Sequence, residues 1–178
     1  MTAAADALFD RALVEEATKK SGLIWVRGAG PDGPDGPVRA LWHAWVDGAA
    51  HLVGDGPGEQ PLPDLVDGAR AEVTVRSKDK GGRVVAWTAA VAELAPRSEA
   101  WEAAVAELKG KRLNAPDGER MVDRWAAECR VLRLAPCEVS TVLPDGSLAA
   151  PPLPTQATTR QPIPAALPRL LARRAKKR

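Results

Sequence analysis

The sequence contains no tyrosine, one phenylalanine, two cysteines and two histidines. Cys129 and Cys137 form no CxxC pair and no cluster of histidines accompanies them, so a metal site is not expected and the thiols are expected to be reduced. No apolar run approaches the ~20 residues that a membrane-spanning helix requires. The first residues lack the basic start and apolar stretch of a secretory signal. We therefore expect a cytoplasmic protein that does not span a membrane.

The formal net charge of +2 is unevenly distributed along the chain. Residues 160–178 contain five arginines and two lysines and no acidic residue, so they carry +7 and the preceding residues carry 2 − 7 = −5. Proteins bind nucleic acid through clustered lysine and arginine that release counterions from the phosphates. Because the body is negatively charged, any contact with nucleic acid is expected to come from this basic segment.

Proline marks the end of the folded part of the sequence. Residues 151–168 contain so many prolines that neither a helix nor a strand interior is expected there. The length suits one domain of ordinary size with an appendage. We predict a domain over residues 4–136, followed by a largely disordered, proline-rich and basic tail over residues 137–178.

Apolar spacing and turn signals predict the order of elements in the domain. Apolar residues at helical spacing, Phe9, Ala12, Leu13 and Ala17, indicate an amphipathic helix, and strict alternation over residues 38–46 indicates a strand. The expected elements are a helix over 6–20, strands over 23–26, 38–46 and 49–53, a short helical turn near 64–66, strands over 71–76 and 83–94, a helix from Ser98 to about Leu113, and a strand over 128–134. Sheets built from hairpins tend to close into barrels that hide their edges.

This order, with GLIWV, GPVRALWHAWVDGAAHLVG, VTVRSK and GGRVVAWTAAVAEL placed on it, resembles the split β-barrel family typified by pyridoxamine 5′-phosphate oxidase and related flavin and deazaflavin reductases. The resemblance covers roughly residues 6–136. It implies an α+β, mainly β fold: a six-stranded antiparallel split β-barrel with flanking helices. It also implies a homodimer that binds FMN, or a deazaflavin cofactor, in a groove between two barrels. The cofactor would carry hydride transfer to or from a small molecule.

A basic cluster near one hairpin is the strongest candidate for binding the cofactor phosphate. Alternation places Thr74, Arg76 and Lys78 on one face of a strand. A phosphate needs donors of this kind, because arginine donates in a fork, lysine adds a point charge and a hydroxyl adds a further donor. The alternative is a solvated hairpin end. The expected phosphate-binding residues are Arg76, Ser77 and Lys78, completed by Arg39 and Arg83.

Aromatic and polar residues near the middle of the sequence are further candidates. Trp42 and His43 could flank a planar cofactor, with the imidazole shuttling a proton, although packing is the favoured role for Trp42 and for Trp45 on the opposite face. His43 and His51 are expected on adjacent strands, but two histidines without a cysteine or carboxylate cluster make a poor metal site.

The glycine-rich loop that ends at Gln60 could approach a ligand closely through its backbone, although it lacks the lysine and spacing of a nucleotide P-loop. Gln60 is therefore a candidate cofactor contact. The pyridoxamine 5′-phosphate oxidase subgroup has Ser-Arg-Lys where this chain reads Pro57-Gly58-Glu59-Gln60, and Glu59 would repel a phosphate. Either the phosphate is held elsewhere, with residues 76–78 the best candidate, or the barrel has lost its cofactor.

Two classes of function follow from these observations. The first is an FMN- or deazaflavin-dependent oxidoreductase that acts on a small molecule. The second is a non-catalytic, dimeric interaction module without a cofactor, whose basic tail contacts nucleic acid or another acidic partner. Arg120, Arg124 and Trp125, which precede the last strand, would either reach the groove of a partner subunit or pack on the surface.

Overall fold

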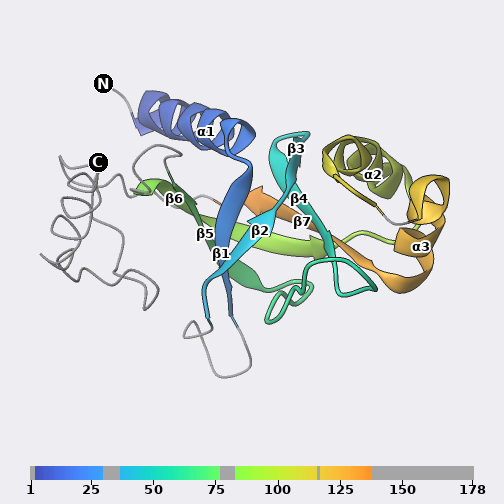
Figure 1. The fold of residues 1–178 in the computed structure, drawn as a ribbon. Helices are drawn as coiled ribbons and strands as arrows, with labels where there is room; N and C mark the ends of the chain where they lie inside the picture. Colours follow the sequence, from blue (N-terminus) through green and yellow to red (C-terminus); the bar gives the residue numbers. More distant parts are fainter. Residues whose placement is uncertain (1–2, 30–36, 77–82, 116, 138–178) are drawn as a thin grey trace, which may run out of the picture.

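The computed structural model describes residues 3–29, 37–76, 83–115 and 117–137. The proline-rich tail expected over residues 137–178 thus lies, apart from Cys137, outside the described residues. The elements are α1 (Ala3–Lys20), β1 (Leu23–Gly28), β2 (Arg39–Trp42), β3 (Ala44–Val46), β4 (Ala49–Gly54), β5 (Arg70–Arg76), β6 (Arg83–Glu93), α2 (Glu99–Lys111), the 3-10 turn η1 (Gly118–Arg120), α3 (Met121–Glu128) and β7 (Arg130–Pro136) (Figure 1).

The strands form one antiparallel, 7-stranded sheet in the order β2-β1-β5-β6-β7-β4-β3. The first and last strands in this order, β2 and β3, are consecutive in the chain and are separated by His43 alone. They are two halves of the strand predicted over residues 38–46, bent so that one half pairs with β1 and the other with β4. The bend joins the two edges of the sheet, which confirms the predicted barrel.

Side chains that alternate inward along the strands fill the barrel. In the bent strand Leu41 and Trp45 face this interior, whereas Trp42 and Ala44 face out, so the predicted alternation continues through His43. Helix α1 packs on the barrel through Val14 and Ala17. The buried interior consists of Val14, Ile24, Val26, Leu41, Ala50, Leu52, Leu62, Leu65, Ala71, Val73, Val75, Val85, Trp87, Ala89, Val91, Leu132 and Leu134.

A second core lies outside the barrel, where α2 and α3 cover the outer face of β3, β4 and β7. Figure 1 shows these two helices on one side of the sheet, away from α1. Ser98 caps α2 as predicted, because its hydroxyl accepts a hydrogen bond from the backbone N–H of Trp101 at 3.3 Å. The buried members of this core are Ala44, Val53, Trp101, Ala104, Val105, Leu108, Met121, Trp125 and Val131.

Three expectations about the elements are wrong in detail. Phe9 is 66% exposed, because α1 turns Val14 and Thr18 toward the barrel together with Ala17, which was predicted to face it. Residues 64–66 contain no helix: turns lie at residues 63–64 and 67–68, and Asp64 has a positive φ of 63°. Helix α3 was not predicted, and because it runs to Glu128 the last strand begins at Arg130 rather than at residue 128.

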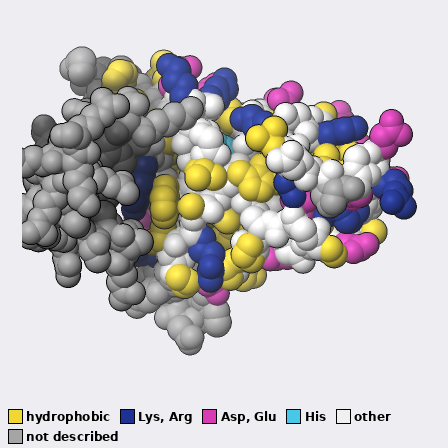
Figure 2. Space-filling model, in the orientation of Figure 1, with side chains coloured by type: hydrophobic (Ala, Val, Ile, Leu, Met, Phe, Trp, Pro, Cys, Tyr) yellow, Lys and Arg dark blue, Asp and Glu magenta, His cyan; other side chains and the backbone are white. Residues whose placement is uncertain are grey.

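The surface of the described residues is of mixed character. Figure 2 shows apolar patches over the middle of the molecule that are interrupted by polar and charged atoms. Among the described residues no helix is long and apolar enough to cross a membrane. The larger exposed apolar side chains are Leu8, Phe9, Leu23, Val38, Val66 and Leu113.

Candidate functional site

The outer face of β1, β5 and β6 carries Arg76, the member of the predicted basic cluster whose side chain the structure describes there. Register places Trp25 opposite Thr74, and Thr74 opposite Ala86, so these three side chains form a row across the face. Arg76 lies over the indole of Trp25, with its guanidinium carbon 4.2 Å from the ring centroid. The stacking holds an exposed cation in place and leaves the edge of the guanidinium available to an anion.

The structure brings together only part of the predicted phosphate site. Ser77 and Lys78 lie outside the described residues, and for Arg83 the structure gives the backbone, which pairs with Arg76. Arg39 is opposite Val26, whose side chain is buried inside the barrel, so Arg39 is on the opposite face of the sheet from Arg76. One chain therefore does not place these two arginines on a single phosphate.

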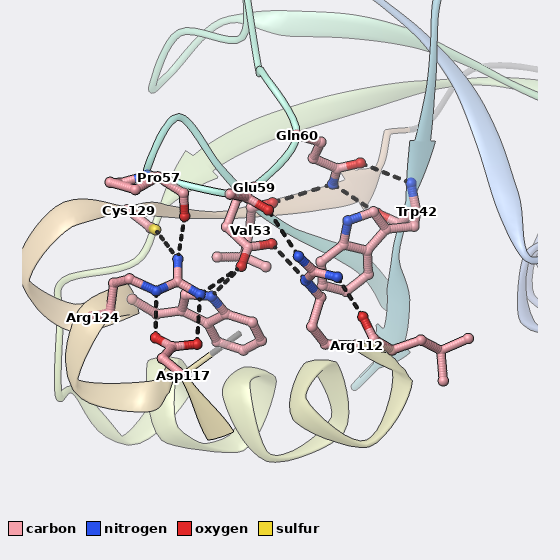
Figure 3. A network of polar contacts seen from close by, with 12 residues as sticks. Trp42, Val53, Pro57, Glu59, Gln60, Arg112, Asp117, Arg124 and Cys129 are labelled. Atoms are coloured by element: carbon pink, nitrogen blue, oxygen red, sulfur yellow. Dashed lines mark hydrogen bonds and ion pairs between the residues drawn. The ribbon is translucent and has the colours of Figure 1, made fainter. Parts of the chain in front are cut away.

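Gln60 stabilises the bend between β2 and β3 through hydrogen bonds of its side-chain amide (Figure 3). Its side-chain oxygen accepts a hydrogen bond from the backbone N–H of Trp42 at 2.9 Å. Its amide nitrogen donates to the carbonyls of Trp42 at 2.9 Å and Val53 at 3.2 Å. Trp42 is opposite Leu23 of β1, and the Gln60 amide satisfies the N–H and C=O of Trp42 where the ladder changes direction. This contact explains the position of Gln60 without a ligand.

His43 occupies the bend itself and is buried. Its Nε2 lies 3.0 Å from the backbone oxygen of Thr18 in α1, so the imidazole joins the helix to the barrel. Burial lowers the pKa of His43 to about 4, although that hydrogen bond acts in the opposite direction. The ring is therefore neutral near pH 7. The neighbouring Trp42 ring packs against Trp125, with centroids 6.4 Å apart. Packing, the favoured alternative for Trp42, is what the structure shows.

Glu59 is the centre of a buried ionic network that the sequence analysis did not anticipate (Figure 3). Its side chain has 0% exposure and accepts hydrogen bonds from Arg112 Nε at 3.0 Å, Arg124 Nη2 at 2.9 Å and Trp125 Nε1 at 3.0 Å. Arg124 also donates to Asp117, and this bond raises the pKa of the guanidinium above its ordinary value. The charge of Glu59 is therefore neutralised inside the chain.

This network changes the interpretation of two earlier expectations. Glu59 does not face an open phosphate site, because two arginines and an indole enclose it. Arg124 and Trp125 contact Glu59 within the same chain, and the contact with a partner subunit considered above stays a prediction. Arg112 is 53 positions from Glu59, and no spacing rule in the sequence links residues so far apart.

The glycine-rich loop between β4 and Leu62 packs closely against its own chain. A Cβ on Gly54 would lie 2.2 Å from the backbone oxygen of Gln60, and a Cβ on Gly56 would lie 2.2 Å from Cys129 Sγ. The close approach that glycine permits is thus made to the chain's own atoms. Burial raises the pKa of the Cys129 thiol, and both cysteines are free. Among the described residues no group of three metal-ligating side chains was found.

Comparison with known proteins identifies the architecture. No family model and no curated protein matches the sequence. The heme storage protein HutZ of Vibrio cholerae aligns with a TM-score of 0.53 at 12% identity over 73% of this chain and 91% of that chain. A conserved hypothetical protein of Mycobacterium tuberculosis aligns with a TM-score of 0.53 at 18% identity over 80% and 85%.

A third structure, a proposed pyridoxamine 5′-phosphate oxidase from Listeria innocua, aligns with a TM-score of 0.50 at 12% identity over 74% of this chain and 97% of that chain. The chain has the split β-barrel fold. The resemblance inferred from the strand order is confirmed at the level of fold. Since each of these identities is below 20%, activity and cofactor do not follow from the split barrel.

Proposed function

We propose that this split barrel is a cytoplasmic homodimer that binds FMN or a deazaflavin cofactor and transfers hydride to or from a small molecule. The observation that carries the proposal is the Arg76 guanidinium, stacked on Trp25 beside Thr74 on the outer face of the sheet. These residues offer donors suited to a phosphate group. A second copy of the chain would close a groove over this face, and the bound cofactor would supply the redox chemistry.

The donor set of the described residues fits the phosphate end of such a cofactor. Arg76 has no carboxylate partner among the described residues, and Thr74 adds a hydroxyl on the same face. Ser77 and Lys78 follow Arg76 in the sequence, Arg83 is opposite Arg76 in the sheet register, and all three remain part of the proposal. Trp42, His43 and Gln60 make contacts within the chain, so their proposed role is to fix the barrel wall beside the groove.

An absorption spectrum of the full chain, purified without added cofactor, tests the proposal. Oxidised flavin or deazaflavin gives characteristic visible bands, whereas heme, the group named for the neighbour HutZ, gives a Soret band. Flavin bands, or saturable calorimetric binding of FMN or a deazaflavin cofactor, are expected. A colourless protein that binds neither compound would exclude the proposed function.

Variants of Arg76 locate the phosphate. We expect Arg76→Ala to weaken FMN binding at least tenfold, about 1.4 kcal/mol, because a charged fork donor is lost. Arg76→Lys keeps the charge but not the fork, and an intermediate loss is expected. Arg11→Ala removes an exposed arginine of α1 and serves as the matched control. Equal affinity in all variants would place the phosphate elsewhere.

A second candidate function is the interaction module without a cofactor. It is favoured by the internal contacts of Gln60, His43 and Glu59, which occupy residues that a ligand would otherwise use. The basic residues 160–178 would then bind nucleic acid or another acidic partner. Deleting residues 161–178 is expected to abolish this binding at low salt and to leave cofactor binding unchanged. Unchanged acidic-partner binding after deletion would reject the module.

A further inference from the structure

A shallow pocket of about 250 Å³ lies on the outer face of β1, β5 and β6, beyond the stacked Trp25 and Arg76. Its lining consists of Arg27, Gly28, Ala29, Arg70, Ala71 and Glu72, with Thr88 at the far side. Gly28 and Ala71 are a buried, paired position of β1 and β5, while Arg70 is exposed. No other part of the proposed site uses these residues.

Sheet register fixes how the polar side chains are arranged. Arg27 is opposite Glu72, and Glu72 is opposite Thr88, so the three form a row across β1, β5 and β6. Arg70 stands two positions along β5 from Glu72 and therefore on the same face. Two guanidinium groups and a hydroxyl thus converge on one small concavity, which is the donor set of an oxyanion site.

The contacts of Arg27 leave part of its donor capacity unused. Its Nη1 is 3.8 Å from Glu72 Oε2, too long for a hydrogen bond, so the pair orients the guanidinium by charge. Its Nε is buried and has no hydrogen-bond partner among the described residues. A buried donor without a partner is unfavourable, and a bound oxyanion would supply acceptors to the guanidinium.

We propose that this pocket binds the carboxylate or phosphate group of a small anionic ligand. The pocket is smaller than the ~300–1,000 Å³ of sites for drug-sized ligands, so it takes a small acid or one acidic arm of a larger molecule. Glu72 and Arg76 are four positions apart along β5, about 13 Å at ~3.3 Å per residue, so the pocket is a site apart from Arg76. If the proposed function holds, this ligand is the substrate.

The acidic residue in the pocket makes the proposal sharply testable. Glu72 repels an incoming anion but also orients Arg27. If Arg27 and Glu72 formed only a structural ion pair across the strands, a change at Glu72 would not alter the affinity for an anion. Glu72→Gln removes one negative charge at the site. Binding of an anion is therefore expected to tighten about threefold or more in this variant, the opposite direction from loss of an arginine.

The experiment titrates the full chain with inorganic phosphate and, separately, with succinate, at constant ionic strength in a calorimeter. We expect saturable binding of at least one probe, weakened at least tenfold by Arg27→Ala and by Arg70→Ala. Stronger binding of phosphate identifies a phosphate ligand, and stronger binding of succinate a carboxylate. Arg133→Ala, an arginine elsewhere on the outer face, should leave the affinity unchanged and is the matched control.

Three results would overturn the proposal: no saturable binding of either probe, equal weakening by Arg133→Ala, or no tightening by Glu72→Gln. If Arg27→Ala fails to fold, Arg27→Lys tests the same contact, because it keeps the charge and loses the fork; an unchanged affinity there also counts against the site. The visible spectrum of the same samples separates the two proposals. A colourless protein with the expected affinity pattern removes the proposed cofactor and leaves the pocket established.

Discussion

At the scale of single residues, the structure contains a buried carboxylate that is paired with arginines and two buried histidines whose pKa values are lowered by burial. The Glu59 side chain has no contact with solvent and instead accepts hydrogen bonds from Arg112, Arg124 and Trp125. Removing one member of a buried ion pair leaves the opposite charge uncompensated, which costs more than the pair itself contributes. The network therefore links the loop between β4 and β5 to α2 and α3, so the packing of each depends on the other two.

Glu59→Gln is expected to lower the free energy of unfolding by about 2–4 kcal/mol, because two partly buried arginines lose their carboxylate. Urea unfolding monitored by tryptophan fluorescence measures the change. Glu107→Gln alters an exposed glutamate of α2 and should cost less than about 0.5 kcal/mol. Equal stability of the two variants would show that the buried network contributes nothing.

Two buried histidines predict how stability depends on pH. Burial lowers the pKa of His43 and of His51 to about 4, and neighbouring Lys111 and Arg133 act in the same direction. The unfolded chain binds a proton near pH 6.5, so it gains protons before the folded chain does, and stability falls as the pH drops from 6.5 toward 4.

Between pH 7.5 and 5 we expect a loss of about 1–2 kcal/mol for each histidine. Chemical denaturation at several pH values gives the slope. A His43→Gln, His51→Gln double variant should flatten it, since glutamine does not titrate. A slope that is the same in both proteins would mean that the imidazoles are already protonated, or accessible to protons, in the folded state.

At the scale of elements, the loop between β4 and β5 and the helix α3 form one packed unit. Gly56 lies against Cys129, the C-cap of α3, so close that no side chain fits between them. By contrast, Gly110 lies within α2 and an added Cβ would meet nothing within 4 Å. The two glycines thus provide a matched pair for the same chemical change.

Gly56→Ala is expected to destabilise the fold by more than about 2 kcal/mol, because the methyl group would overlap Cys129 Sγ and the backbone of Glu128. Gly110→Ala is expected to stabilise it by about 0.4–1 kcal/mol, since alanine restricts the unfolded chain and favours the helix. Thermal unfolding of both variants gives the comparison. A neutral Gly56→Ala would mean that the loop moves freely away from α3.

Periodicity in the sequence predicted elements better than it predicted their contacts. Alternation over residues 38–46 identified the strand and the opposite faces of Trp42 and Trp45, which the structure confirms. It did not show the bend at His43, because alternation continues unbroken through it. Helix α3 is only 8 residues long, and a segment so short carries little periodic signal.

The contacts of the candidate site were harder to predict from the sequence than the fold was. Arg76 was predicted from local charge and spacing, and the structure places it on an outer face beside Thr74. The roles of Glu59 and Gln60 depend on partners that are distant in sequence, such as Arg112 and Trp42. A single sequence contains no spacing rule for such pairs, so only the folded chain reveals them.

At the scale of the whole molecule, two hydrophobic cores share the same sheet. The inner one fills the barrel and the outer one lies under α2 and α3, and the described members of both fall within residues 14–134. Strand β7 contributes Leu132 to the inner core and Val131 to the outer one. We therefore propose that the folded domain ends with this strand and that the basic tail adds no part of either core.

A chain that ends after Cys137 should unfold in one cooperative transition with a free energy within about 1 kcal/mol of the full chain, because both cores remain complete. Urea unfolding of the two proteins measures the difference. The shorter chain should also retain any bound cofactor. A loss of several kcal/mol would show that residues beyond Cys137 pack on the domain.

The bend at His43 makes the barrel sensitive to the parity of insertions. One extra residue beside His43 would send Trp45 outward and turn Ala44 and Val46 into the interior, since side chains alternate with a period of two. Two extra residues would return each side chain to its original face of the sheet and would only lengthen the bend. Natural or engineered length variation at this point should therefore occur in even steps, and an odd step would have to be absorbed by a bulge.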